Sequence, residues 1–148
     1  MSNLNYLFKN VCIASDHAGF NLKENIKNHL ISKNVSIFDL GPYNEKSVDY
    51  PDFAKKLAKR IKAEKSDVGI LICGSGTGMA ISANKIKNIR AAVCYNLKVT
   101  RLSRLHNNAN IIALGSRVTK KTLALKLVET FLKTNFEAGR HLRRVKKI

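Results

Sequence analysis

The sequence has no long apolar run, few cysteines and few acidic residues, and each shortage excludes a class of protein. No run approaches the roughly 20 consecutive apolar residues that a membrane-spanning helix needs. Residues 1–10 also have no apolar stretch of the kind found in a secretory signal peptide. These two absences predict a soluble protein that stays in the cytoplasm.

The chain contains 3 cysteines, an odd number, and their spacing is not that of a metal site. A disulfide framework and a zinc site are therefore not expected. Cys12 and Cys94 lie in apolar, strand-like runs, so we interpret them as small core residues. Cys73 differs from both because a glycine-rich segment follows it directly.

Acidic residues are scarce, because 10 Asp and Glu stand against 27 Lys and Arg and give a formal net charge of +17. Residues 117–148 contain 10 Lys or Arg and only Glu129 and Glu137 in opposition. This excess of positive charge favours phosphorylated partners. Nucleic acid would be one such partner. However, most of the lysines fall on the polar faces of predicted helices and no aromatic stacking pattern accompanies them, which argues against nucleic acid.

The chain has no Pro- or Ser-rich linker, internal repeat or low-complexity segment that would divide it. Its 148 residues, 45% of them hydrophobic, suit one domain with a single core. We therefore expect residues 1–148 to form a single domain. Residues 135–148 are too charged for the core and are expected to form a C-terminal basic segment that packs elsewhere.

Short runs of β-forming residues alternate with helical patterns along the chain. Leu22, Ile26 and Leu30, for example, recur at the four-residue spacing of a helix face. The predicted strands are residues 11–15, 35–40, 68–73, 91–94 and 111–114. This alternation predicts an α/β protein with a three-layer Rossmann-like fold, in which helices cover both faces of a five-stranded parallel sheet. We expect the strand order 2-1-3-4-5.

In such sheets ligands bind at the carboxyl ends of the strands, where the strand order reverses. For the expected order this point lies between the first and third strands, which are followed by Asp16-His17 and Cys73-Gly74. An acid, an imidazole and a thiol would then converge. A structural interpretation stays open, in which Asp16 caps a helix and Gly19 serves the turn.

The segment Cys73-Gly74-Ser75-Gly76-Thr77-Gly78 opens a predicted helix and is the strongest candidate for chemistry. Glycines allow positive φ, so successive backbone N–H groups can turn toward one anion, and the same field favours thiolate over thiol at Cys73. No Gly-Lys-Ser/Thr sequence closes the loop, and its spacing is not that of a dinucleotide site. An NTPase or a dehydrogenase is therefore not expected. A tightly packed turn without function is the alternative.

The histidines allow more than one interpretation. His106, with Asn107 and Asn108 after it, suits either a functional residue or the C-terminal turn of a helix, where His and Asn are favourable. His29 and His141 are interpreted as surface residues, although His141 could contact a phosphate.

Six short segments occur in order between residues 11 and 145. They are Ser15-Asp16-His17-Ala18-Gly19-Phe20, Asp49-Tyr50-Pro51, the Cys73 loop with Ala83-Asn84-Lys85, Leu102-Ser103-Arg104-Leu105-His106-Asn107, Leu114-Gly115-Ser116-Arg117 and Gly139-Arg140-His141. Together they resemble the type B ribose-5-phosphate isomerases, which form one sugar-phosphate isomerase family with the galactose-6-phosphate isomerase subunits. Six segments in register are far more specific than the glycine loop alone.

The resemblance implies that Cys73 is the catalytic base and that His106 opens the sugar ring, with Ser75 and Asp16 assisting. It implies no metal or other cofactor. Met79 places the chain in the cysteine branch of the family, because the other branch has a Glu there and Gly in place of the cysteine. Ser75 stands where relatives often carry Thr, but the hydroxyl is kept. Substrate contacts are implied for Asp16, His17, Tyr50, Gly74, Ser75, Gly76, Thr77, Gly78, Asn107, Arg117, Arg140 and Arg144, while the role of Arg143 stays open.

The resemblance also implies a homodimer or homotetramer whose active sites are shared between subunits. His106 follows the predicted helix before the last strand, so it belongs at the amino ends of the strands, opposite Cys73. It would reach a Cys73 crevice most simply in a partner subunit. The implied reaction interconverts ribose 5-phosphate and ribulose 5-phosphate through a cis-enediolate. The alternatives are isomerisation of a phosphorylated hexose and a sugar-phosphate- or RNA-binding module without activity.

Overall fold

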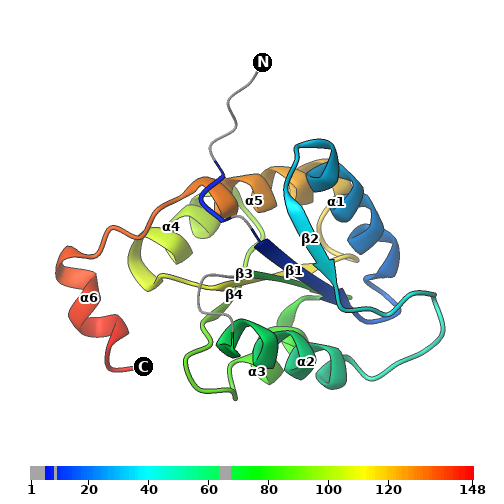
Figure 1. Ribbon diagram of the computed structural model, residues 1–148, viewed down its shortest axis with the longest axis horizontal. Coiled ribbons are helices and arrows are strands. Elements are labelled where there is room, and N and C mark those ends of the chain that lie inside the picture. The colour runs from blue at the N-terminus through cyan, green and yellow to red at the C-terminus, as the bar shows by residue number, and fades with distance from the viewer. Residues whose placement is uncertain (1–5, 9, 64–67) are drawn as a thin grey trace.

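The computed structural model describes residues 6–8, 10–63 and 68–148 of the chain. Its strands are β1 (Asn10–Ser15), β2 (Ser36–Asp39), β3 (Val68–Cys73), β4 (Ala91–Val93) and β5 (Ile111–Gly115). They form one parallel sheet in the order β2-β1-β3-β5-β4 (Figure 1). The predicted fold class is confirmed.

The last two strands are exchanged relative to the expected order 2-1-3-4-5, because β5 lies beside β3 and β4 forms the edge. Burial explains the exchange. All residues of β5 are buried, whereas the three residues of β4 are only partly buried. The longer and more apolar strand therefore takes the interior position of the sheet. The reversal of strand order between β1 and β3 is unaffected.

The helices are α1 (Phe20–Ser32), α2 (Tyr50–Ala63), α3 (Thr77–Ala83), α4 (Leu97–Asn107), α5 (Lys121–Lys133) and α6 (Gly139–Val145). In Figure 1, α1 and α5 lie on one face of the sheet, and α2 and α3 lie on the other. Alternate residues of β1 divide between the two faces, as a pleated strand requires. Ile13 packs in the cluster with α1 and α5, while Cys12 packs in the cluster with α2 and α3.

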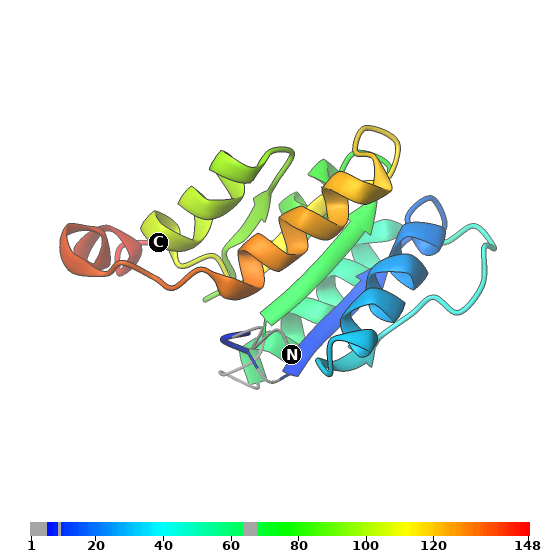
Figure 2. The same ribbon diagram turned by 90° about the horizontal axis from the view of Figure 1, so that it is seen from above.

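The C-terminal segment leaves the layered part of the fold. Figures 1 and 2 both place α6 beyond the end of α4, away from β1 and β2. The connection from α5 is fastened to α4 by two hydrogen bonds, from the Arg104 Nε to the Thr134 carbonyl at 3.0 Å and from the Glu137 N–H to the Leu105 carbonyl at 3.1 Å. None of the described helices is long and apolar enough to cross a bilayer.

Candidate active site

A cavity of about 450 Å³ opens at the carboxyl edge of the sheet. Asp16 follows β1, Cys73 ends β3 and is paired in register with Gly115, and Arg117 follows β5. Parallel strands end at the same edge, so these three side chains reach one space. The cavity is lined by Asp16, Tyr50, Cys73, Gly74, Ser75, Gly78, Arg117 and Val118. An acid, a thiol, a hydroxyl and a guanidinium therefore face the same cavity.

The backbone of the Cys73 loop makes a hydrogen bond to the Cys73 sulfur. The Gly76 N–H donates to the Cys73 Sγ at 3.1 Å, and Cys73 is 5% exposed. This donor stabilises negative charge on sulfur. Gly76 has φ +82°, and a Cβ there would lie 2.9 Å from the Leu114 carbonyl carbon, so glycine is required at this position. Gly76 and the exposed Thr77 shape the loop without lining the cavity.

Backbone hydrogen bonds tie the loops of this edge together. The Ser116 N–H donates to the Cys73 carbonyl at 2.8 Å, and the Arg117 N–H donates to the Gly74 carbonyl at 3.0 Å. The Ser116 hydroxyl donates to the Ala18 carbonyl at 2.8 Å. The loops after β1, β3 and β5 therefore hold one another in place, and Arg117 is fixed beside the glycine loop.

Asp16 and His17 have structural partners as well as a place near the cavity. The Gly19 N–H donates to Asp16 Oδ1 at 3.0 Å, so the carboxylate stabilises the turn before α1, although Gly19 rather than Asp16 is the N-cap residue. The Val48 N–H donates to His17 Nδ1 at 3.2 Å, which places the proton of a neutral ring on Nε2. His17 fixes the loop that leads to Tyr50 and does not itself line the cavity.

A second cavity of about 410 Å³ lies at the end of α4 and is lined by His106, Asn107, His141, Arg144, Val145 and Ile148. The chain turns through Asn108 after this helix and begins β5 at Ile111, at the amino edge of the sheet. His106 and Cys73 therefore lie at opposite edges within one chain, as expected. Arg140 is exposed on α6 and does not line the second cavity.

His141 is a correction to the sequence interpretation, because it is 4% exposed and not a surface residue. Its ring stacks on that of His106, with centroids 4.1 Å apart and an interplanar angle of 17°. Burial lowers the pKa of His141, and the charges of His106 and Arg140 lower this pKa further, so the ring is neutral at neutral pH. His29, the other histidine assigned to the surface, is partly exposed and lies 2.8 Å from Glu129.

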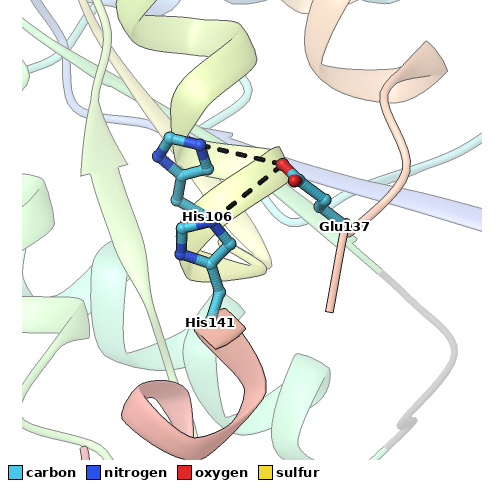
Figure 3. A group of neighbouring side chains, drawn as sticks. All are labelled: His106, Glu137 and His141. Carbon is cyan, nitrogen blue, oxygen red and sulfur yellow. Dashed lines mark ion pairs between the residues drawn. The ribbon is translucent and has the colours of Figure 1, made fainter. Parts of the chain in front are cut away.

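Glu137 faces both stacked rings (Figure 3). Its Oε2 lies 3.8 Å from the Nε2 of His106 and 4.0 Å from the Nε2 of His141. The ligand atoms of the three residues lie within 4.8 Å of one another, a spacing that suits a metal ion. However, nitrogen lone pairs lie in the ring planes, so two parallel rings cannot both point at one ion unless one of them rotates. Sequence reasoning missed Glu137, whose only local signal is its spacing of four residues from His141.

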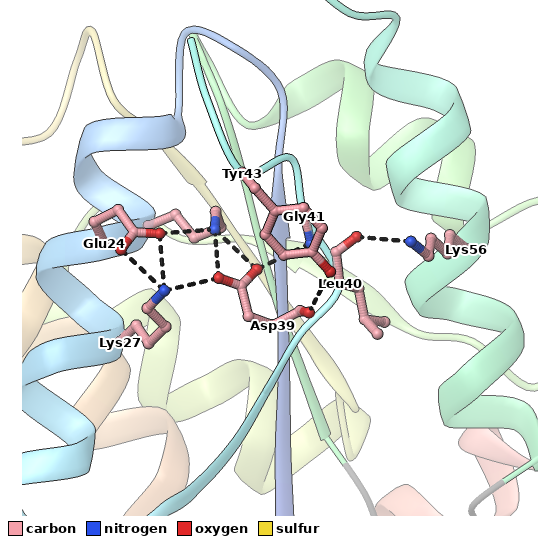
Figure 4. Close-up of polar contacts among 8 residues, drawn as sticks. Glu24, Lys27, Asp39, Leu40, Gly41, Tyr43 and Lys56 are labelled. Carbon is pink, nitrogen blue, oxygen red and sulfur yellow. Dashed lines mark hydrogen bonds and ion pairs between the residues drawn. The ribbon is translucent and has the colours of Figure 1, made fainter.

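Asp39 organises the start of the loop between β2 and α2 (Figure 4). It accepts hydrogen bonds from the fully buried Lys23 at 2.7 Å, from Lys27 at 2.9 Å and from the Gly41 N–H at 2.9 Å. Burial raises the pKa of the Asp39 carboxyl, but these hydrogen bonds outweigh burial and hold the pKa below its ordinary value. The network fixes the beginning of the segment that carries Tyr50 to the cavity.

The fold and the carboxyl-edge cavity define an α/β protein with a thiol that borders the cavity at the junction of sheet and loop. The family profile described as Ribose/Galactose Isomerase matches residues 11–148. The chain therefore belongs to the Ribose/Galactose Isomerase family, and the predicted family is confirmed.

Relatives and solved structures agree with this assignment. The chain is 47% identical over 141 residues to the probable ribose-5-phosphate isomerase B of Mycoplasma genitalium, covering 94% of this chain and 93% of that protein. It is 41% identical over 140 residues to the ribose-5-phosphate isomerase B of Escherichia coli, covering 95% and 94%. A Thermotoga maritima ribose 5-phosphate isomerase structure matches with a TM-score of 0.91 and 51% identity, covering 93% and 95%. The Mycoplasma genitalium structure with bound ribulose-5-phosphate matches with a TM-score of 0.89 and 46% identity, covering 93% and 92%.

Proposed function

We propose that this protein interconverts ribose 5-phosphate and ribulose 5-phosphate. The observation that carries the proposal is the Cys73 thiol, which accepts the Gly76 N–H at 3.1 Å and faces a cavity shared with Asp16, Ser75 and Arg117. The bound ribulose-5-phosphate of the Mycoplasma genitalium relative supports the choice of a pentose. We further propose that residues 1–148 work as one domain in the cytoplasm.

Cys73 is the proposed base of the isomerisation. Its thiolate removes the proton from C2 of the open-chain aldose, and the electron pair moves to the carbonyl oxygen to form a cis-enediolate. The same group then returns a proton to C1 while the proton of the C2 hydroxyl passes to the C1 oxygen, which yields the ketose without any metal or other cofactor. Negative charge develops on the sugar oxygens, where the loop N–H groups and the Ser75 hydroxyl stabilise it more strongly than in the ground state.

His106 is the proposed ring-opening residue. Ribose 5-phosphate in solution is mainly a furanose, so opening its ring requires a proton to reach the ring oxygen while the anomeric hydroxyl loses one. A histidine exchanges protons near neutral pH and suits this step, with Asp16 as a helper. Asn107 and His17 are proposed to contact sugar hydroxyls, and Tyr50 forms a wall of the pocket.

The arginines are proposed to bind the phosphate. Arg117 lies beside the Cys73 loop, while Arg140 and Arg144 lie on α6, and Arg144 lines the same cavity as His106. A guanidinium stays charged and donates paired hydrogen bonds to phosphate oxygens, which suits this role. The net charge of +17 adds a long-range field that draws anionic sugars toward the protein.

The active site is proposed to form between two subunits of a homodimer or a larger homo-oligomer. Cys73 stands at the carboxyl edge of the sheet and His106 at the amino edge, and strands of typical length separate such edges by roughly 17–20 Å. A five-carbon sugar cannot bridge that distance within one chain. The His106 cavity of one subunit would therefore complete the Cys73 cavity of another.

A coupled assay with ribose 5-phosphate tests the reaction. Turnover with a kcat of about 1–10³ s⁻¹ is expected. Hexose 6-phosphates are assayed as alternative substrates. A higher kcat/KM for any of them than for ribose 5-phosphate would show that the natural substrate is a phosphorylated hexose and not a pentose. Binding of ribose 5-phosphate without turnover would instead make the protein a binding module.

A further inference from the structure

Glu137 and His141 surround the proposed ring-opening residue, and neither has a role in the reaction described above. His141 covers one face of the His106 ring by stacking at 4.1 Å, and the Glu137 carboxylate lies 3.8 Å from the His106 Nε2. In Figure 3 the other ring nitrogen of His106 points away from Glu137. The His106 ring therefore has His141 against one face and Glu137 at its Nε2 edge.

The segment that carries Glu137 is held firmly against α4. The Glu137 N–H donates to the Leu105 carbonyl, directly before His106, and the buried Arg104 donates to the Thr134 carbonyl. Between Glu137 and α6, Ala138 adopts φ 57° and ψ −112°, a conformation that is costly for a residue with a Cβ. Such backbone strain persists only where surrounding contacts fix it, and it is concentrated at functional sites.

We propose that Glu137 is a positioning residue that holds the Nε2–H of His106, so that Nδ1 exchanges the proton with the sugar ring oxygen. The stacked His141 ring fixes the plane in which His106 acts. This inference rests on the proposed role of His106. The hydrogen bond made by one imidazole nitrogen decides which nitrogen is free for proton transfer, and a carboxylate is a common orienting partner.

Two histidines face one carboxylate, and the positions of the side chains favour one of the two pairings. The Glu137 Oε2 lies slightly nearer to the His106 Nε2 than to the His141 Nε2, and the Glu137 N–H is bonded to the Leu105 carbonyl directly before His106, so the geometry favours the pairing with His106. The 3.8 Å separation is an ion-pair distance and exceeds a hydrogen bond. Because the Glu137 side chain is 56% exposed, it can swing toward the ring, and catalytic hydrogen bonds commonly tighten when substrate binds.

The variant Glu137→Gln keeps the size of the side chain and removes its charge. We expect kcat for ribose 5-phosphate to fall about 10- to 100-fold, as for other partners that orient a functional histidine. KM should not rise, because the lost carboxylate acts on the same His141 ring as Arg140 and Arg144, the proposed phosphate ligands, and opposes an anionic substrate. Single-turnover rates starting from ribulose 5-phosphate, which cannot close a furanose ring, should change less than twofold. Glu137→Asp should recover part of the lost kcat.

Glu129→Gln is the matched control, because it removes a carboxylate that also faces a histidine, His29, but lines neither cavity, and it should leave kcat unchanged. The double variant His106→Asn with Glu137→Gln should be no slower than His106→Asn alone, since Glu137 acts through His106. A normal kcat in Glu137→Gln, or a further loss in the double variant, would overturn the inference. Absence of isomerase activity in the unaltered protein would instead remove the proposed function itself.

Discussion

Cys73 differs from Cys94 in its surroundings rather than in its burial. All three are buried, but Cys73 borders a cavity and accepts a backbone N–H, whereas burial raises the pKa of the Cys94 thiol. Thiolate, and not thiol, removes a proton or attacks an alkylating reagent. Of Cys73 and Cys94, Cys73 should therefore be the stronger base and the faster to react with an alkylating reagent.

Cys73→Ser and Cys73→Ala should lower kcat by at least about 10²–10⁴-fold, the usual contribution of a general base. Binding of ribose 5-phosphate, measured by calorimetry, should be retained because the thiol acts on the C2 proton. Cys94→Ser serves as the control and should keep its kcat. In the unaltered protein, iodoacetamide should label Cys73 before Cys94. Near-normal turnover in the Cys73 variants would eliminate the proposed base.

At the scale of elements, the turn from β3 into α3 depends on one backbone conformation. Gly76→Ala should destabilise the fold by about 1–3 kcal/mol, the usual cost of a residue held in such a region. The new methyl group would also press on Leu114. Gly139→Ala is the matched control, since Gly139 also has positive φ but has nothing within 4 Å of its Cβ position. A larger fall in Tm for Gly139→Ala than for Gly76→Ala would contradict this account.

The link between α1 and β2 depends on a buried ion pair. Asp39→Asn should lower the free energy of unfolding by about 3 kcal/mol, the lower end for breaking a buried pair, because Glu24 remains as a partner of Lys23. The exposed Glu45 offers a control, since Glu45→Gln should change stability by less than about 0.5 kcal/mol. Urea unfolding of the three proteins measures both effects.

The same pair predicts a pH dependence with a definite sign. The Asp39 pKa lies below its ordinary value of 3.8, so the ionised carboxyl contributes stability above that value and loses the contribution as pH falls through the lowered pKa. Unfolding curves below pH 4 should therefore show a steeper loss of stability in the unaltered protein than in Asp39→Asn. Equal slopes would show that Asp39 is not the group that titrates.

The strands could be predicted from the sequence because short runs of β-forming residues determine where they lie. Each of the predicted strands is present, and β2 is only one residue shorter at each end than expected. The order of β4 and β5 was not predictable, since two short apolar runs do not say which of them lies next to β3. The burial of His141 and the bond between His17 and Val48 were missed for a related reason. Both depend on contacts between segments far apart in sequence.

At the scale of the whole molecule, the positions of Cys73 and His106 predict complementation between inactive subunits. When Cys73→Ala and His106→Asn proteins are mixed and allowed to exchange subunits, a mixed dimer contains one site with both groups and one with neither. Random pairing makes about half of the dimers mixed, so about one quarter of normal turnover should return. No recovery after verified exchange would mean that each chain builds its own site.

The placement of the two cavities at opposite edges of the sheet also sets how activity responds to dilution. Under the proposed shared site, a lone chain has no complete set of reacting groups, so turnover per chain follows the fraction of chains that are paired and obeys mass action. Specific activity should fall as the protein is diluted through the dissociation constant of the subunit contact. After a sudden dilution, its decay should report how fast subunits separate. The abundance of the protein would then set both the number of enzyme molecules and the activity of each one.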